Sequence, residues 1–219
     1  MLIISRHRNE TKFDTQLAET LAGNLETLVW SVPFLYDLKR TGKTAAALQT
    51  LDEPLAVFAP LPPRPLSILV QQITQREKPP AVFDSRLENV DLLCQAVREW
   101  QHNGLLPGNI PGGKVERLDE AAENRWYPML DTERCIGCLE CVNFCLFGVY
   151  AVGENDKPFV EQPDACRDGC PACSRVCPGK AIMFPLYDDP RISGERDDWE
   201  DELDVLVDEV DKFELRHSS

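Results

Sequence analysis

Two groups of cysteines carry the clearest chemical signal in this sequence of 219 residues, which contains nine cysteines in all. Thiolate sulfur is the usual ligand of iron–sulfur clusters, and gaps of two residues let one loop place three sulfurs around one cluster. The spacing therefore predicts iron–sulfur chemistry. The first group, CIGCLECVNFC, contains Cys135, Cys138, Cys141 and Cys145, and the second, CRDGCPACSRVC, contains Cys166, Cys170, Cys173 and Cys177.

Structural zinc is the alternative for these ligands, because four cysteines can also bind a Zn²⁺ ion. Zinc sites normally use two C-x-x-C units that a longer loop separates. The first group instead has three cysteines at consecutive two-residue gaps, and the second repeats this arrangement with one gap of three residues. This pattern favours clusters over zinc. The ninth cysteine, Cys94, lies far from both groups and is expected to be a small buried apolar residue.

From residue 127 to residue 187 the chain resembles the bacterial two-cluster 4Fe–4S ferredoxins, on these cysteines and on Pro178 after the last of them. In that family the fourth cysteine of each group ligates the cluster of the other group. The resemblance therefore implies two 4Fe–4S clusters with crossed ligands. One cluster would be held by Cys135, Cys138, Cys141 and Cys177, and the other by Cys145, Cys166, Cys170 and Cys173.

The same resemblance implies two small pairs of strands. YPMLD (127–131) and KAIMF (180–184) stand where the family has its paired outer strands. FGVYAV (147–152) and PFVEQ (158–162) stand where it has its central hairpin. The cysteine-rich stretch is also similar to a group of longer ferredoxin-type proteins that carry an extra N-terminal domain.

Two features depart from the family pattern. Leu146 follows Cys145 where the family usually has proline, and three residues instead of two separate Cys166 from Cys170. Gly169 in that gap can take a conformation that absorbs an extra residue. An apolar shell around each cluster tunes its reduction potential. The candidates for that shell are Ile136, Val142, Phe144, Ile182 and Met183.

The first hundred residues alternate between short apolar segments and amphipathic segments. This alternation predicts an α/β domain, a parallel sheet covered by helices with flavodoxin- or Rossmann-like layering, ahead of a small α+β two-cluster ferredoxin domain. Strands are expected at 2–5, 27–32, 55–61 and 81–85, and helices at 11–22, 44–51, 65–73 and 89–101. The expected domains are the α/β domain (1–102), a Gly- and Pro-rich linker (103–125), the ferredoxin domain (126–187) and an acidic tail (188–219).

Parallel sheets usually bind ligands beyond the carboxyl ends of their strands, but no Gly-x-Gly-x-x-Gly motif names a ligand here. RTGKT (40–44) resembles the end of a phosphate-binding loop. The full motif needs a glycine where Asp37 stands, so we expect only a loop that starts a helix. His7, between Arg6 and Arg8, could face a ligand at the edge of the sheet or lie in a solvated loop.

The net charge of −14 is concentrated in the C-terminal part, where residues 126–219 contain 21 acids and 9 bases. Such a charge repels nucleic acid and anionic membranes, and it attracts a partner with a basic docking surface. The tail contains an amphipathic helical pattern at 195–214, which either packs on the protein itself or docks a partner. No apolar run is long enough for membrane insertion. Nine cysteines without a secretory signal pattern indicate a cytoplasmic protein.

These features together predict a carrier of single electrons between protein redox partners, and not an independent enzyme. No nucleophile–base arrangement, paired-carboxylate motif or nucleotide motif suggests catalysis by the chain itself. A subunit of a larger oxidoreductase is compatible with this function. The alternative is an iron–sulfur subunit or redox sensor whose N-terminal α/β domain binds a small ligand or cofactor.

Overall fold

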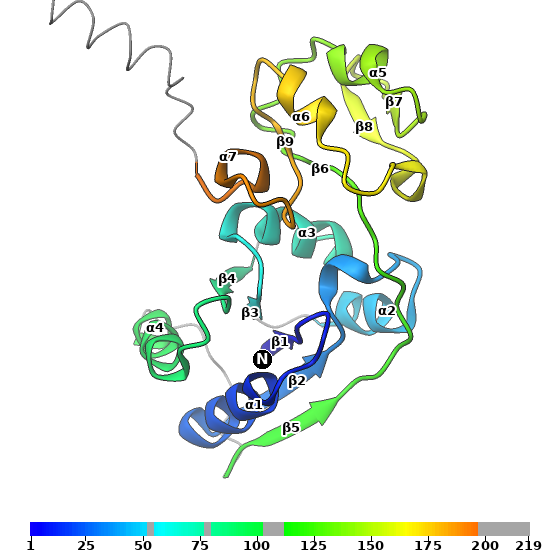
Figure 1. Cartoon of the computed structure of the whole chain (residues 1–219). Helices are drawn as coiled ribbons and strands as arrows, with labels where there is room; N and C mark the ends of the chain where they lie inside the picture. The colour runs from blue at the N-terminus through cyan, green and yellow to red at the C-terminus, as the bar shows by residue number, and fades with distance from the viewer. Residues whose placement is uncertain (52–54, 77–79, 103–111, 197–219) are drawn as a thin grey trace, which may run out of the picture.

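A computed structural model describes residues 1–51, 55–76, 80–102 and 112–196 of the chain. Figure 1 shows an α/β part built from the first half of the sequence and a smaller cysteine-rich part that follows it. The smaller part, residues 126–196, is called the ferredoxin region below. The chain crosses from the α/β part to this region once, after the strand β5.

The α/β part is centred on a sheet of five parallel strands in the order β4-β3-β1-β2-β5. The first four strands confirm the predicted segments. β1 and β3 are apolar runs buried between two layers of helices, whereas β4 lies at an edge of the sheet and is half-buried. The strands are β1 (Leu2–Ser5), β2 (Leu28–Val32), β3 (Ala56–Ala59), β4 (Ala81–Asp84) and β5 (Lys114–Arg117).

Strand β5 corrects the predicted linker. Residues 114–117 lie within the range assigned to a linker, yet they pair with β2 and form one edge of the sheet. Their sequence, KVER, is mostly charged and exposed. An edge strand faces solvent on one side and commonly carries charged residues, so it lacks the apolar run that identified the other strands.

Two helices cover each face of the sheet (Figure 1). α1 (Lys12–Leu25) and α4 (Val90–His102) pack on the face that carries Leu2 and Ile4. α2 (Lys43–Gln49) and α3 (Pro63–Thr74) pack on the opposite face with Ile3. Successive strand residues point to opposite faces, so this division follows from the sequence. Cys94 is buried in the α1–α4 layer, as predicted.

The strand order is not that of a flavodoxin throughout. The run β2-β1-β3-β4 is the flavodoxin order, but that fold places its fifth strand beside β4, whereas β5 here pairs with β2. The α/β layering is therefore present, and the flavodoxin- or Rossmann-like assignment is not confirmed. The order of the strands reverses between β1 and β3, where the loops after these strands diverge.

The ferredoxin region contains the two strand pairs that the sequence predicted. β6 (Met129–Leu130) pairs antiparallel with β9 (Ile182–Met183), and β7 (Tyr150–Val152) pairs antiparallel with β8 (Pro158–Val160). Its short helices are α5 (Glu140–Phe144), η2 (Pro163–Ala165) and α6 (Ala172–Val176). Cysteines of the two sequence groups lie on and beside these helices, so α5 and α6 decide where the sulfurs converge.

The two parts share one apolar core. Met129 of β6 and Met183 of β9 are buried in the same core as α2 and α3. The rings of Tyr36, in the 3₁₀ helix η1 (Leu35–Asp37), and Tyr127 stack with centroids 4.3 Å apart. The Tyr36 hydroxyl donates to the Tyr127 carbonyl and accepts from the Tyr127 backbone amide. The ferredoxin region is therefore packed against the α/β part.

The start of the predicted acidic tail belongs to the ferredoxin region. α7 (Pro190–Ser193) packs Ile192 into the core around the cysteines, and Arg86 of the α/β part donates to Glu195 at 2.8 Å. The amphipathic pattern at 195–214 lies almost entirely outside the described residues. Among the helices that the described ranges contain, none combines the length and the apolar character that a membrane span requires.

Candidate metal centre

Four cysteines from both sequence groups line one cavity of about 700 Å³ in the ferredoxin region. These four are the residues predicted to hold the second cluster, and we call them the second-cluster cysteines. Cys145 ends α5, Cys166 follows η2, Cys170 lies in the loop before α6, and Cys173 lies within α6. The helices α5 and α6 therefore bring Cys145 of the first sequence group to the second group.

The other four cysteines, the first-cluster cysteines, include Cys177 of the second sequence group. Burial raises the pKa of the Cys141 thiol to about 12, and charge on the neighbouring Cys177, Cys173 and Cys135 contributes to the rise. Cys177 directly follows α6. It therefore lies near cysteines of the first group. Cys141 and Cys177 are buried, Cys135 is half-buried and Cys138 is exposed.

The second-cluster cysteines influence one another in the same way. Burial, together with charge on Cys173, Cys170 and Cys145, raises the pKa of the Cys166 thiol to about 12. Burial also raises the pKa of Cys173 to about 11, with Cys145 and Cys170 among its charged neighbours. Each of these thiols is thus held near others that would repel it as thiolates.

This donor set fits an iron–sulfur cluster. Thiols whose pKa lies near 11 or 12 are protonated at neutral pH, and each sulfur must lose its proton before it can bind a metal. Thiolates that line one cavity repel one another, and bound iron would supply the positive charge that offsets this repulsion. The cavity lined by the second-cluster cysteines is where such charge would be bound.

Hydrogen bonds from Tyr150, Ala181 and Trp126 help to fix the positions of three of the cysteines. The Tyr150 hydroxyl donates to Cys173 Sγ at 3.1 Å, and the Ala181 backbone amide donates to Cys177 Sγ at 3.4 Å. Trp126 donates from its indole nitrogen to the Cys170 carbonyl at 3.2 Å. Sequence reasoning missed Tyr150 and Trp126 as site residues. Tyr150 could have been found, because it is a polar aromatic at an inward position of a predicted strand.

The five predicted shell residues are divided between several environments. Ile182 is buried in the core around the cysteines, and Val142 packs against that core. Met183 is buried instead in the core shared with α2 and α3. Neighbouring residues of a strand point to opposite faces, so Ile182 and Met183 could not both face a cluster. Ile136 is 67% exposed, and Phe144, which lines the cavity, is 49% exposed.

Both departures from the family pattern fall at this cavity. Leu146, in place of the usual proline, is 92% exposed and lines the cavity. Gly169, in the longer gap, has φ of +71°, a left-handed conformation that side chains other than glycine rarely adopt. A glycine is thus what lets the three-residue gap turn there.

The segment that resembles a phosphate loop is occupied by a carboxylate of the chain itself. Gly42 precedes α2, and the backbone amides of Lys43 and Thr44 donate to the two oxygens of Glu120 at 3.1 and 2.8 Å. A side chain at Gly42 would collide with Glu120. The prediction of a loop that starts a helix is therefore confirmed, with Glu120 as the capping group.

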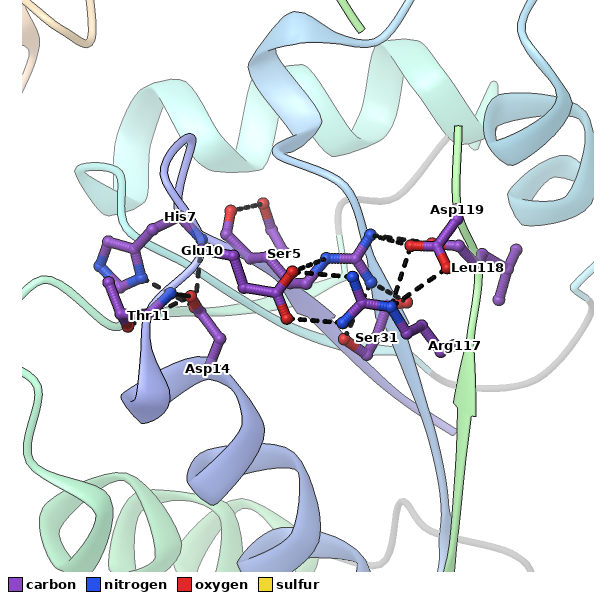
Figure 2. Close-up of polar contacts among 10 residues, drawn as sticks. Ser5, His7, Glu10, Thr11, Asp14, Ser31, Arg117, Leu118 and Asp119 are labelled. Atoms are coloured by element: carbon purple, nitrogen blue, oxygen red, sulfur yellow. Dashed lines mark hydrogen bonds and ion pairs between the residues drawn. The ribbon is translucent and has the colours of Figure 1, made fainter. Parts of the chain in front are cut away.

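Charged side chains contact one another and the backbone at the carboxyl edge of the sheet (Figure 2). His7 Nδ1 lies 2.8 Å from an oxygen of the buried Asp14, so His7 is held at the start of α1 and does not lie in a freely solvated loop. The buried Arg6 donates to the carbonyls of Ser31 and Leu118, and to Asp119 at 2.9 Å. Arg6 thereby joins the ends of β1, β2 and β5.

Comparison with protein families supports the cluster interpretation. The family described as "4Fe-4S binding domain" matches residues 132–148 and 163–187, which contain all eight grouped cysteines. The chain is 40% identical over 72 residues to the pyruvate synthase subunit PorD of Methanothermobacter marburgensis, a match that covers 33% of this chain and 82% of that protein.

Two further relatives match this chain over only about half of their own length. An uncharacterized ferredoxin of Methanocaldococcus jannaschii is 45% identical over 67 residues, which are 30% of this chain and 45% of that protein. A putative electron transport protein of Escherichia coli, YsaA, is 31% identical over 78 residues, which are 34% of this chain and 50% of that protein. The chain thus spans about half the length of either relative.

Proposed function

Because the chain belongs to the ferredoxin family, with a 4Fe–4S binding domain, we propose that it passes single electrons between protein redox partners through two 4Fe–4S clusters. One observation carries this proposal. Cys145 from the first sequence group lines a single cavity with Cys166, Cys170 and Cys173 from the second. In two-cluster ferredoxins the fourth cysteine of each group crosses over in this way.

The second cluster would accordingly be held by Cys145, Cys166, Cys170 and Cys173. The first would be held by Cys135, Cys138, Cys141 and Cys177, of which Cys135, Cys141 and Cys177 pack in the core around the cysteines. A 4Fe–4S cluster supplies reversible one-electron chemistry when bound. The chain supplies the thiolates, the hydrogen bonds to sulfur and the apolar surroundings that set the reduction potential.

The partners in this proposal are redox proteins with a basic docking surface. The net charge of −12 in residues 126–219, which include the ferredoxin region and the segment after it, would attract such a partner. Leu146 and Phe147 are exposed beside Cys145 and line the cavity, so an apolar rim of the partner could reach that centre there. The chain would be a carrier or the electron-transfer subunit of an oxidoreductase, not a catalyst itself.

A reducing compartment suits this chemistry, because cluster ligands must stay reduced, and we therefore propose a cytoplasmic location. The α/β part has its own role in the proposal, as a support on which the ferredoxin region packs through Met129, Met183 and Tyr127. Charged groups at the carboxyl edge of the sheet pair with one another, as Arg6 does with Asp119 and His7 with Asp14, which favours electron transfer over ligand binding at this edge.

Anaerobic purification followed by iron and sulfide analysis tests the proposal. About eight iron and eight sulfide per chain are expected for two 4Fe–4S clusters. Potentiometric titration followed by electron paramagnetic resonance should show reversible reduction. Tightly bound zinc without visible absorption by iron–sulfur centres would falsify the proposal, and so would iron that cannot be reduced reversibly.

A further inference from the structure

Tyr150 places a hydroxyl group on one of the predicted cluster ligands. It is the first residue of β7, its side chain is buried at 7% exposure, and its hydroxyl donates to Cys173 Sγ at 3.1 Å. Burial raises the pKa of Tyr150, and charge on Cys173, Cys141 and Cys145 raises it further. The hydroxyl thus donates to one cysteine of the set Cys145, Cys166, Cys170 and Cys173, and Tyr150 lines the same cavity as those four.

We propose that Tyr150 sets the reduction potential of the cluster held by Cys145, Cys166, Cys170 and Cys173, through the hydrogen bond from its hydroxyl to Cys173 Sγ. This inference rests on the proposed function, because it requires two clusters with crossed ligands. Tyr150 is a positioning and tuning residue in this view, since it touches a ligand sulfur and takes no part in binding iron.

The sign of the effect follows from charge. Reduction adds one electron, so the ligand sulfurs become more negative and accept hydrogen bonds more strongly. A donor fixed on Cys173 therefore stabilises the reduced form more than the oxidised form and raises the potential. The site is shielded from water, because Tyr150 and Cys173 are both buried, and solvent cannot replace a lost donor.

The surroundings keep the hydroxyl in place. Tyr150 pairs with Val160 across the β7–β8 hairpin, and both pack into the core around the cysteines. A phenol carries a single proton to donate and keeps it at neutral pH. The ring is held by the strand, the proton has one acceptor at hydrogen-bond distance, and that acceptor is a predicted ligand sulfur.

The test is the variant Tyr150→Phe, which removes the hydroxyl and keeps the ring. For one of the two clusters, the equilibrium constant for reduction should fall by up to about tenfold. This corresponds to a potential lower by up to about 59 mV for a one-electron couple. The other potential should change less. Tyr187→Phe is the matched control, because the Tyr187 hydroxyl accepts from Arg175 at 3.1 Å near the surface.

The outcomes separate this inference from the proposed function. If the wild-type protein lacks two reducible clusters, the proposed function fails. Suppose that two clusters are present and that the Tyr150→Phe and Tyr187→Phe variants have the same two potentials. The inference is then overturned and the proposed function stands. An equal shift of both potentials would also overturn it, because the hydrogen bond reaches one set of ligands.

A second measurement decides the matter if Tyr150→Phe does not retain its iron. The wild-type protein is produced with fluorinated tyrosine, whose more acidic phenol donates more strongly. One potential should then rise, the opposite direction to the Phe variant. The Tyr187→Phe variant with the same label should show the same rise. No rise in either labelled protein overturns the inference.

Discussion

Arg64 on α3 and Asp131 after β6 form a two-point contact that joins the α/β part to the ferredoxin region. The Nε and one terminal nitrogen of Arg64 lie 3.0 and 2.9 Å from Oδ2 of Asp131. Both side chains are largely buried. The contact lies beside the apolar core that Met129 and Met183 share with α3. An ion pair and apolar packing therefore both join the two parts of the chain.

Replacing Arg64 should destabilise the folded protein. We expect Arg64→Ala to lower the free energy of unfolding by about 2 kcal/mol, because it leaves the buried Asp131 carboxylate without this donor. Arg40→Ala is the control, since Arg40 donates to Gln72 on the surface. Denaturant unfolding of the iron-loaded protein measures both. Equal effects of the two substitutions would contradict a role for this contact in stability.

The Tyr36–Tyr127 pair gives a second stability prediction. Tyr36→Phe removes the hydroxyl that donates to the Tyr127 carbonyl and accepts from the Tyr127 amide. Two buried backbone groups then lose their partner, and about 1–3 kcal/mol of stability should be lost. Thermal unfolding checks this, with Tyr187→Phe as the control at an exposed hydroxyl. If the two variants melt at the same temperature, water satisfies the Tyr127 backbone in place of Tyr36.

Crossed ligation predicts an asymmetric effect of losing Cys145. Cys145→Ala should damage the cluster on Cys166, Cys170 and Cys173 and leave the cluster on Cys135, Cys138 and Cys141 largely intact. Electron paramagnetic resonance and iron analysis of the variant measure this loss. Cys94→Ala is the control, because Cys94 is buried in the α1–α4 layer far from both groups. Loss of the cluster of the first sequence group instead would show that ligation is not crossed.

Glu120 should stabilise the protein in a pH-dependent way. Hydrogen bonds from the amides of Thr44 and Lys43, and the charge of Lys43, lower the pKa of this carboxyl although partial burial opposes the shift. A carboxyl with a lowered folded-state pKa contributes stability above its unfolded pKa and loses it as pH falls through the folded value. Glu120→Gln should therefore cost roughly 0.5–1 kcal/mol at neutral pH and less in acid.

Unfolding of the wild type and Glu120→Gln between neutral and acidic pH measures this difference. Glu19→Gln is the control, because Glu19 is exposed in the middle of α1 and does not cap a helix. A stability gap for Glu120→Gln that stays constant with pH would show that the carboxylate charge does not hold the start of α2.

The acidic C-terminal segment predicts a salt-dependent rate. Deleting residues 197–219 removes 10 acids and 2 bases, so electron transfer to a basic haem protein used as acceptor should slow. The dependence on salt should weaken as well, since the screening length falls from about 10 Å at 0.1 M salt to about 3 Å at 1 M. Unchanged cluster potentials provide the control. If the truncated protein transfers electrons at the same rate as the full chain at every salt concentration, this segment takes no part in docking.

The sequence predicted those elements whose signal is local. Four strands and four helices of the α/β part follow from runs of apolar residues and from turn residues nearby, whereas the two strand pairs of the ferredoxin region were implied by the resemblance to ferredoxins. Strand β5 was missed because its residues are charged, and its place beside β2 depends on tertiary pairing. The role of Glu120 was missed for a similar reason, since it caps a helix that begins 77 residues earlier, at Lys43.

At the candidate site, the cysteines were predicted by their type and spacing, whereas their surroundings were not. Met183 is next to Ile182 in sequence but faces the core shared with the α/β part. Tyr150 became a site residue only when the hairpin placed its hydroxyl on Cys173. Such contacts join residues far apart in the chain, so a local pattern can indicate that Tyr150 faces inward but cannot name its partner.

The shared core also sets an order for maturation during synthesis. The strands of the sheet, up to Arg117, leave the ribosome before the first grouped cysteine, Cys135. Domains commonly fold as they emerge, N-terminal first. The surface of α3 that receives Met129 and Met183 is then in place when the cysteines appear. The cysteine-rich segment would then emerge next to a packing surface that is already folded.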